Sequence, residues 1–227
     1  MSKELIKGIS KDNEGYLWIA TDAGVLMFDG AEASLFYKEL PSPYIKSFLK
    51  VSSDRFLVLH DFGIKEIVKS NDSILFKPLT LGDKVFDDPL SYPKSIYEDR
   101  YGNIWIGEFN AVVRINKDGL KRFDLGEDYR SINYHRTFSF TEDAFGNLWI
   151  APFKGKLLSF DRENEELDEV NVDYPLTEVS SLVNIKGDYL MVGGAEGLFV
   201  LKIDSDKNIQ QTRFISKVKD VSAMVSF

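Results

Sequence analysis

The 227-residue chain contains no cysteine, which excludes disulfides, thiolate nucleophiles and thiolate metal ligands together. Its only two histidines, His60 and His135, do not stand at a metal-ligand spacing from another histidine or a carboxylate. We expect both to be loop residues and expect no metal site. No apolar run approaches the ~20 residues that span a bilayer, and the first residues lack the charged-then-apolar order of a signal peptide.

Basic charge is also scarce. Lysine and arginine number 28 against 36 acidic residues, so the net charge is −8, and the acidic residues are scattered along the chain. Such a surface repels a phosphate backbone, and nucleic acid is therefore not an expected partner. Hydrophobic residues make up 44% of the sequence, which is typical of a folded globular protein.

A short motif recurs along the chain. An aspartate is followed three residues later by a glycine and six residues later by a tryptophan at Asp12, Asp99 and Asp143, and these copies contain all three tryptophans. Two weaker copies place Leu57 and Met191 in the tryptophan slot. The resulting period of about 43 residues lies in the range of β-propeller blades, each of which has four short strands.

Alternation and turn residues divide each copy into four strands. In the third copy we expect strands at 94–98, 104–107, 111–116 and 120–124, with a tight turn at 99–103. The predicted fold is an all-β propeller of four-stranded antiparallel blades. The expected blades are 5–40, 44–80, 93–126, 135–172 and 178–215, with the first strand of a sixth at 218–227.

Six first strands and five complete blades favour a fragment of a larger, seven-bladed propeller, and a five-bladed ring is the alternative. A fragment would expose unpaired sheet edges, so self-association as a homodimer is expected.

The repeated residues have a structural interpretation. The aspartate is expected to accept backbone N–H bonds in the turn, the glycine to take positive φ, and the tryptophan to pack between blades. A second glycine follows the tryptophan slot by six residues at Gly24, Gly63 and Gly155, where it lets the third strand restart closely, and Ala111 replaces it in the third copy.

The motif Asp-x-x-Gly-x-Leu/Ile-Trp-Ile-Ala/Gly, clearest at residues 12–30, resembles the two-component regulator propeller repeats. That resemblance implies the periplasmic sensor region of a hybrid histidine kinase, many of which respond to oligosaccharides. It also implies that further propeller blades and a kinase of the full-length protein are partners of this chain, and that phosphotransfer takes place elsewhere in that protein.

Two other functions stay open. One is a propeller that serves as a protein-interaction scaffold without a small ligand. The other is a sialidase-like glycoside-active enzyme, because such propellers carry Ser-x-Asp-x-Gly-x-x-Trp turns. Here the step from Asp12 to Gly15 is one residue too long, and nothing gathers the arginines, tyrosine and paired carboxylate that such an enzyme needs. We therefore expect no catalytic residues, no enzymatic activity in this chain and no cofactor.

A ligand is expected on the face formed by the loops between second and third strands and by the links that enter each first strand. Aromatic rings beside carboxylates and amides suit a sugar, whose C–H face stacks while its hydroxyls form hydrogen bonds. Besides Tyr44 on one entering link, the candidate ligand-binding residues are Asp22, His60, Asp61, Tyr92, Glu108, Phe109, Asn110, Tyr134, His135, Arg136, Phe153, Lys154 and Glu196.

Overall fold

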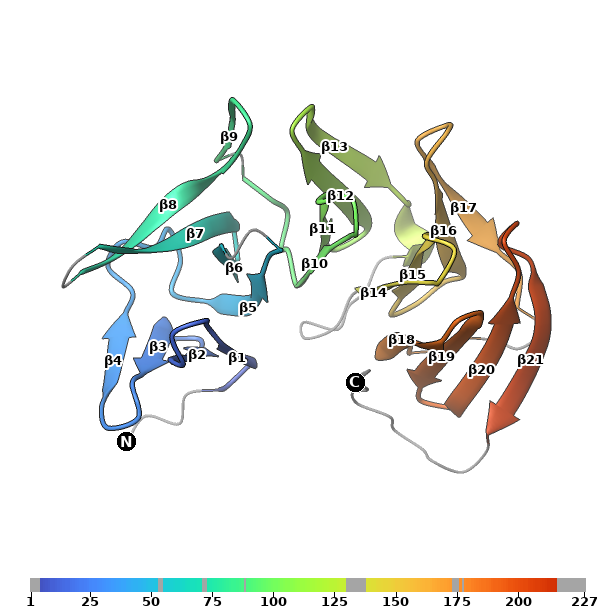
Figure 1. Cartoon of the computed structure of the whole chain (residues 1–227), viewed down its shortest axis with the longest axis horizontal. Coiled ribbons are helices and arrows are strands. Elements are labelled where there is room, and N and C mark those ends of the chain that lie inside the picture. The colour runs from blue at the N-terminus through green and yellow to red at the C-terminus, as the bar shows by residue number, and fades with distance from the viewer. Residues whose placement is uncertain are drawn as a thin grey trace. The chain divides into compact units, whose positions relative to one another are not determined.

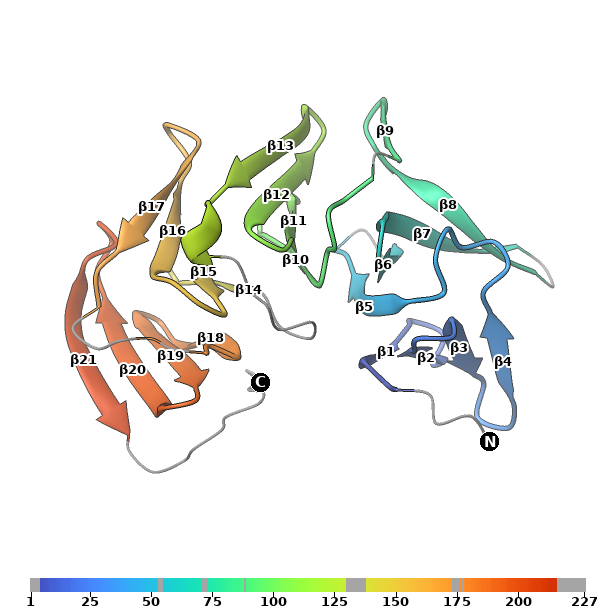
Figure 2. The same ribbon diagram turned by 180° about the vertical axis from the view of Figure 1, so that it is seen from behind.

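The computed structural model describes residues 5–52, 55–70, 73–87, 89–129, 138–172, 176 and 178–215. These residues form five antiparallel sheets, and in each sheet the strands lie side by side in chain order (Figures 1 and 2). The chain divides into two compact units. Unit 1 comprises residues 1–108 and 113–121, and unit 2 comprises residues 109–112 and 122–227.

The first sheet consists of β1 (Gly8–Lys11), β2 (Leu17–Ala20), β3 (Val25–Phe28) and β4 (Ala33–Phe36). The second consists of β5 (Ile45–Lys50), β6 (Phe56–His60), β7 (Gly63–Ser70), β8 (Ser73–Leu81) and β9 (Lys84–Phe86). The third consists of β10 (Ser95–Glu98), β11 (Ile104–Gly107), β12 (Ala111–Asn116) and β13 (Gly119–Asp124). Within unit 1, β5 lies next to both β1 and β10.

A short 3-10 helix (Glu127–Tyr129) precedes the fourth sheet, which consists of β14 (Phe138–Glu142), β15 (Leu148–Pro152), β16 (Leu157–Asp161) and β17 (Glu166–Val170). The fifth consists of β18 (Ser181–Lys186), β19 (Tyr189–Gly194), β20 (Gly197–Ile203) and β21 (Ile209–Ile215). The expected first strand of a sixth blade, at 218–227, lies outside the described residues.

The strands expected in the third repeat match β10 to β13 to within a residue at each end. The second sheet differs, because its fifth strand β9 extends past the expected end at residue 80. A two-residue hairpin at Gly82 and Asp83 turns the chain back, with Gly82 at φ 58° and Leu81 paired with Lys84. Phe86 then buries its ring in the hydrophobic core, which anchors the additional strand.

The three tryptophans are fully buried, as expected for core positions. Trp18 belongs to a hydrophobic cluster with Ile45 and Phe56 of the second sheet. Trp149 belongs to one with Leu182 and Leu190 of the fifth sheet. Each of these tryptophans therefore packs against the neighbouring sheet, where burial of a large aromatic surface stabilises sheets that could not hide both faces alone.

The repeated aspartate does more than close the turn. Asp99 accepts the N–H groups of Tyr101 at 3.0 Å and Asn103 at 2.9 Å, as expected, and Gly102 has φ 77°. Its other carboxylate oxygen accepts Nε1–H of Trp105 at 3.0 Å. The equivalent bonds from Trp18 to Asp12 and from Trp149 to Asp143 are 2.8 and 2.7 Å long. One side chain thus holds the turn and also satisfies a donor that is buried with its ring.

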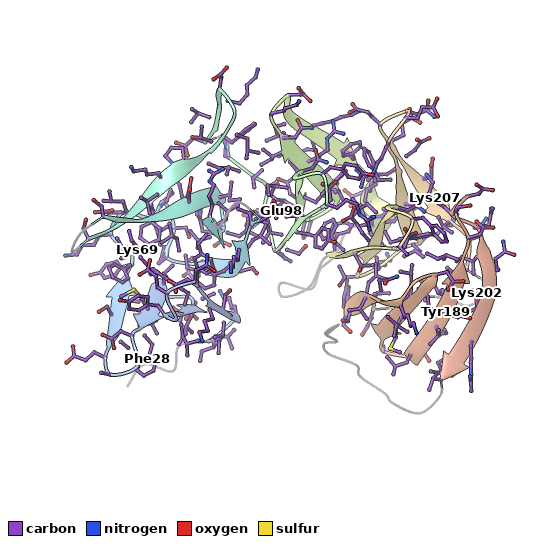
Figure 3. All side chains as sticks on the ribbon, viewed as in Figure 1. Phe28, Lys69, Glu98, Tyr189, Lys202 and Lys207 are labelled. Carbon is purple, nitrogen blue, oxygen red and sulfur yellow. The ribbon has the colours of Figure 1, made fainter. Side chains whose placement is uncertain are left out.

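Two polar contacts connect neighbouring sheets of unit 1. Lys69 on β7, labelled in Figure 3, donates to Asp12 at 2.6 Å, and its ammonium lies 4.0 Å from the centre of the Tyr16 ring. Glu98 on β10 accepts the backbone N–H of Ser52 at 2.6 Å and its hydroxyl at 2.8 Å. Both contacts use charged groups, which form the stronger class of hydrogen bond.

The second glycine has the expected role in two of its three copies. A Cβ at Gly24, where φ is 139°, would lie 2.5 Å from the carbonyl oxygen of Phe36. A Cβ at Gly155, where φ is 110°, would lie 2.6 Å from the ring of Tyr129. Gly63 is not among the positive-φ glycines, so its backbone conformation does not require glycine.

Candidate functional site

Strand register reveals three lysines at equivalent positions in unit 1. Gly8 pairs with Ala20, Ser47 with Leu59 and Ser95 with Gly107, and each partner stands two residues after the tryptophan slot. The residue before each first member of these pairs is a lysine, namely Lys7, Lys46 and Lys94. Because β5 lies between β1 and β10, the three lysines enter three neighbouring first strands at the same end.

The local backbone supports this equivalence. The N–H of Lys7 donates to the carbonyl of Ala20 at 2.9 Å, and that of Lys94 donates to the carbonyl of Gly107 at 3.0 Å. Lys46 lies at a shift of register between Ile45 and Ser47, a β-bulge that re-aims a side chain. In the fourth and fifth sheets the same register position holds Phe138 and Ser180.

Two carboxylates lie at the same end of unit 1. Asp22 follows β2 and Asp61 follows β6, each four residues after the tryptophan slot. Asp61 forms an ion pair with Lys46, and both side chains are 17% exposed. Asp22 accepts the N–H of Leu5 at 3.3 Å. We call Lys7, Lys46, Lys94, Asp22 and Asp61 the inner-strand charge cluster.

The environment of the cluster disfavours charge on its lysines. Burial and the neighbouring ammonium of Lys46 lower the pKa of Lys94 from 10.5 to about 8, against the opposing effect of Asp61. Burial and Lys46 also lower the pKa of Lys7, although Asp22 and Asp61 oppose the shift. The cluster therefore contains ammonium groups that have lost part of their hydration and repel one another.

Tyrosines accompany the lysines on the links that enter the first strands. The ammonium of Lys7 lies 5.5 Å from the ring centre of Tyr44, within the range of a cation–π contact. Tyr92 precedes Lys94 by two residues, is 61% exposed and has a positive φ of 51°. The backbone N–H of Asp61 donates to the carbonyl of Tyr44 at 3.2 Å, which ties this link to the β6–β7 loop. Aromatic surface is thus available beside the charges.

His60 lies beside a separate depression of about 280 Å³ in unit 1, whose lining includes Phe62, Lys65 and Asp87. Lys65 forms an ion pair with Asp87. His60 is 2% exposed and its Nδ1 accepts the N–H of Phe62 at 3.3 Å, while its Nε2 has no hydrogen-bond partner among the described residues. Burial, with a contribution from Lys65, lowers the pKa of His60 to about 4, so the ring is neutral at pH 7.

The expectation that His60 is a loop residue is wrong. It is the last residue of β6 and pairs with Gly63 across a two-residue turn, so the strand continues to the turn itself. Glu108, which was also expected to be a ligand-binding loop residue, is 1% exposed and accepts the N–H of Ser91 at 2.7 Å. Its carboxylate therefore has a structural partner in the link before β10.

The remaining candidates are distributed over both units. Asp22, Asp61 and Tyr92 belong to unit 1, where Asp22 and Asp61 share the charge cluster. The others that the structure describes, all in unit 2, are Phe109, Asn110 and Phe153, which are half-buried, and Lys154 and Glu196, which are exposed. Three further candidates, Tyr134, His135 and Arg136, lie outside the described residues.

The lysines of the cluster were not among the expected site residues, although the sequence contains a signal for them. Lys7, Lys46 and Lys94 each stand eleven residues before the tryptophan slot of their repeat. This constant spacing becomes meaningful only when the strand register shows that the position opens the first strand.

Within the part of the chain that the structure describes, no group of three or more histidine, cysteine, aspartate or glutamate side chains could hold a metal ion. No helix in the same residues is both long and apolar enough to span a bilayer.

Comparison with known proteins places the repeat. Residues 88–110, which include β10, β11 and the turn around Asp99, match the model of the two component regulator propeller. This segment is similar to a two-component regulator propeller repeat. The expected resemblance is thus confirmed at the repeat level. No curated protein matches the sequence significantly.

Solved structures confirm the fold class. The extracellular domain of the hybrid two-component system BT3049 from B. thetaiotaomicron is 18% identical, with a TM-score of 0.68 over 96% of this chain and 29% of that chain. A virginiamycin B lyase from Staphylococcus aureus is 16% identical, with a TM-score of 0.67 over 96% of this chain and 73% of that chain. PorZ, a surface component of the type-IX secretion system of Porphyromonas gingivalis, is 18% identical, with a TM-score of 0.59 over 85% of this chain and 31% of that chain.

These likenesses establish an all-β propeller, which in this chain is built from four four-stranded antiparallel sheets and one of five strands among the described residues. At such low identity they establish the fold alone, because propellers with different functions share it. The chain spans less than a third of the BT3049 domain.

Proposed function

We propose that this chain is part of the ligand-sensing, extracytoplasmic region of a two-component sensor, a periplasmic segment that belongs to a hybrid histidine kinase. The observation that carries the proposal is the two-component regulator propeller repeat at 88–110, supported by the likeness to the BT3049 extracellular domain. Further propeller blades and the kinase of the full-length protein are the proposed partners, and the chain itself has no catalytic role.

The proposed ligand is an oligosaccharide, bound where the links enter the first strands of unit 1. The exposed ring of Tyr92 offers a face for stacking against sugar C–H groups, and the charges of Asp22 and Asp61 offer partners for hydroxyls. Binding would alter the packing of neighbouring sheets or the association of two copies, and the kinase would read that change. Either change would pass the signal to the kinase without a catalytic step in this chain.

A thermal-shift screen of the 227-residue chain against neutral and acidic oligosaccharides tests the sensing role. We expect at least one saccharide to raise the midpoint of unfolding, because a ligand that binds only the folded state stabilises it. The variant Tyr92→Ala should reduce that shift. Tyr101→Ala is the matched control, since Tyr101 is 62% exposed against 61% for Tyr92 but lies in the β10–β11 turn. A panel in which no saccharide shifts the midpoint contradicts the proposal.

Two alternatives predict other outcomes. A protein-interaction scaffold would bind no saccharide in this screen. A glycoside-active enzyme would release smaller sugars during incubation with glycans, which chromatography detects, and this outcome would overturn the non-catalytic role. The likeness to virginiamycin B lyase does not favour an enzyme, because at 16% identity it establishes the fold alone.

A further inference from the structure

The recurrence of lysine at one register position in three neighbouring sheets indicates a shared role. Lys7 and Lys94 immediately precede β1 and β10, and Lys46 is the second residue of β5, so the same register position holds a lysine in the first three sheets. In the fourth and fifth sheets that position holds Phe138 and Ser180. A lysine required by the blade architecture itself would recur in all five sheets. The restriction to three neighbouring strands points to a local role that these side chains share.

That role is constrained by where the ammonium groups lie. All three side chains are half-buried, and Lys46 contacts Asp61 directly. Asp22 and Asp61 are close enough for their charges to act on Lys7, and Asp61 acts on Lys94 as well. Asp61 is thus shared by all three lysines, whereas Asp22 acts on Lys7. Charges that are partly withdrawn from water interact more strongly than exposed ones.

We propose that the ammonium groups of Lys7, Lys46 and Lys94 bind an anionic group, a carboxylate or a sulfate, carried by an acidic oligosaccharide. The carbohydrate part of this inference rests on the proposed sensing function, and the anion part rests on the charge cluster. Each ammonium offers three hydrogen-bond donors and no acceptor, so several lysines around one point match an oxyanion with two or three oxygens.

An entering anion removes two unfavourable features of the free cluster. It replaces hydration that the half-buried ammonium groups have lost, and it adds to Asp61, the ion-pair partner of Lys46, in offsetting the repulsion between Lys46 and its lysine neighbours. The sugar ring that carries the anion can stack on the exposed face of Tyr92, two residues before Lys94. Because the whole chain has a net charge of −8, anions gain no long-range attraction and must bind through these local contacts.

The lowered pKa of Lys94 predicts a second measurable effect, a dependence of anion binding on pH. Below a pH of about 8 the ammonium is charged and attracts the anion, and above it the amine is neutral. Bound anion favours the charged form, so binding should take up protons near pH 8 and weaken as the pH rises through this value. A lysine that served only to pack its methylene groups would produce neither effect.

Isothermal titration of the 227-residue chain at pH 7 tests the inference, with trigalacturonate, a sulfated chondroitin disaccharide, neutral galactotriose and inorganic sulfate as probes. We expect an acidic saccharide to bind, and Lys46→Met and Lys94→Met each to weaken it at least tenfold. Methionine keeps most of the apolar stem. Lys50→Met is the control, because Lys50 is exposed at the other end of β5 and should leave affinity unchanged. Circular dichroism verifies that each variant is folded.

The probes separate the two claims. Binding of trigalacturonate or of the sulfated disaccharide, with the expected lysine dependence, supports the inference and identifies the anion. Lysine-dependent binding of inorganic sulfate without any saccharide supports the anion site and counts against an oligosaccharide ligand. Galactotriose bound as tightly as the acidic probes, and unaffected by both lysine variants, overturns the anion site and leaves the sensing function standing. The absence of binding by all four probes overturns the anion site, and the wider thermal-shift panel then decides the sensing function separately.

Titrations of the acidic saccharide at pH 7 and pH 9 complete the test. We expect the dissociation constant of the unmodified chain to rise severalfold at pH 9 and that of Lys94→Met to change little. Equal affinity at both pH values in the unmodified chain would contradict the role given to Lys94.

Discussion

Replacement of Asp99 by alanine should be among the most damaging single substitutions in the chain. Asp99 is 2% exposed and accepts hydrogen bonds from the backbone of Tyr101 and Asn103, from the Asn103 amide and from Trp105. Alanine removes every one of these acceptors at once. The turn between β10 and β11 and the orientation of the buried indole both depend on them.

The magnitude follows from which donors can find water. Trp105 is fully buried, so its Nε1–H stays unsatisfied, which costs about 1 to 3 kcal/mol. The donors of Tyr101 and Asn103 lie nearer the surface, and each loses a bond to a charged group that is partly replaced by water, at about 1 kcal/mol apiece. The sum predicts a loss of about 4 to 6 kcal/mol in the free energy of unfolding.

Urea unfolding followed by tryptophan fluorescence measures this loss. Asp118→Ala is the control, since Asp118 is exposed in the β12–β13 hairpin and should change stability by less than about 0.5 kcal/mol. A double-mutant cycle with Trp105→Phe isolates the bond between carboxylate and indole. Once phenylalanine has removed the Nε1 donor, Asp99→Ala should cost about 1 to 2 kcal/mol less than it does alone.

Two results would refute this reasoning. Asp99→Ala with stability equal to that of Asp118→Ala would show that the turn does not depend on the carboxylate. A coupling energy near zero between Asp99 and Trp105 would show that the hydrogen bond of 3.0 Å contributes nothing to folding.

Three further perturbations have defined outcomes. Gly155→Ala places a methyl group 2.6 Å from the Tyr129 ring and should destabilise the chain by about 2 to 4 kcal/mol, whereas Gly30→Ala, with a similar positive φ but open space around it, should cost only about 1 kcal/mol. An equal loss of stability in both variants, measured by thermal unfolding, would contradict the steric argument. Tyr129→Phe removes the hydroxyl that donates to Glu169 at 2.7 Å and should cost about 1 kcal/mol in the same assay; no loss would contradict the assigned bond. The folded-state pKa of His60, about 4, lies below its ordinary value of 6.5, so the unfolded chain binds the extra proton between these values. Stability should therefore fall by about 2 kcal/mol as the pH drops from 6.5 to 4, and His60→Phe should flatten this slope in urea titrations at stepped pH; an unchanged slope would contradict the burial of a neutral ring.

The sequence predicts the blade pattern because the motif is made of residues with narrow conformational roles. Gly102 takes the positive φ that the turn requires, and Asp99 accepts the turn's N–H groups. The bond between Asp99 and Trp105 was not predicted, because recurrence shows that two residues matter without showing that they touch. Gly82 and Asp83 form a recognisable two-residue turn, but strand β9 was not predicted. The repeat period placed the end of the blade before these two residues.

The candidate site is only partly visible in the sequence. Asp22 and Asp61 could be placed on one face from the repeat, and in the structure the charges of both act on Lys7. Glu108 and His60 occupy the expected end of the sheet but turn into the interior, and burial depends on packing that the repeat pattern does not contain. Lys46 stands at the same eleven-residue spacing from the tryptophan slot as Lys7 and Lys94, but only the strand register shows that this position lies at the start of a first strand.

Hydrogen–deuterium exchange with mass spectrometry tests the central claim most directly, that a ligand binds where the links enter the first strands of unit 1. The 227-residue chain is compared with and without the saccharide that gives the largest thermal shift. We expect slower exchange in peptides that cover residues 20–24, 44–47, 59–63 and 91–95, with no change in the turns at 12–16 and 99–103. Protection confined to those two turns, or spread evenly over all five sheets, would contradict this claim.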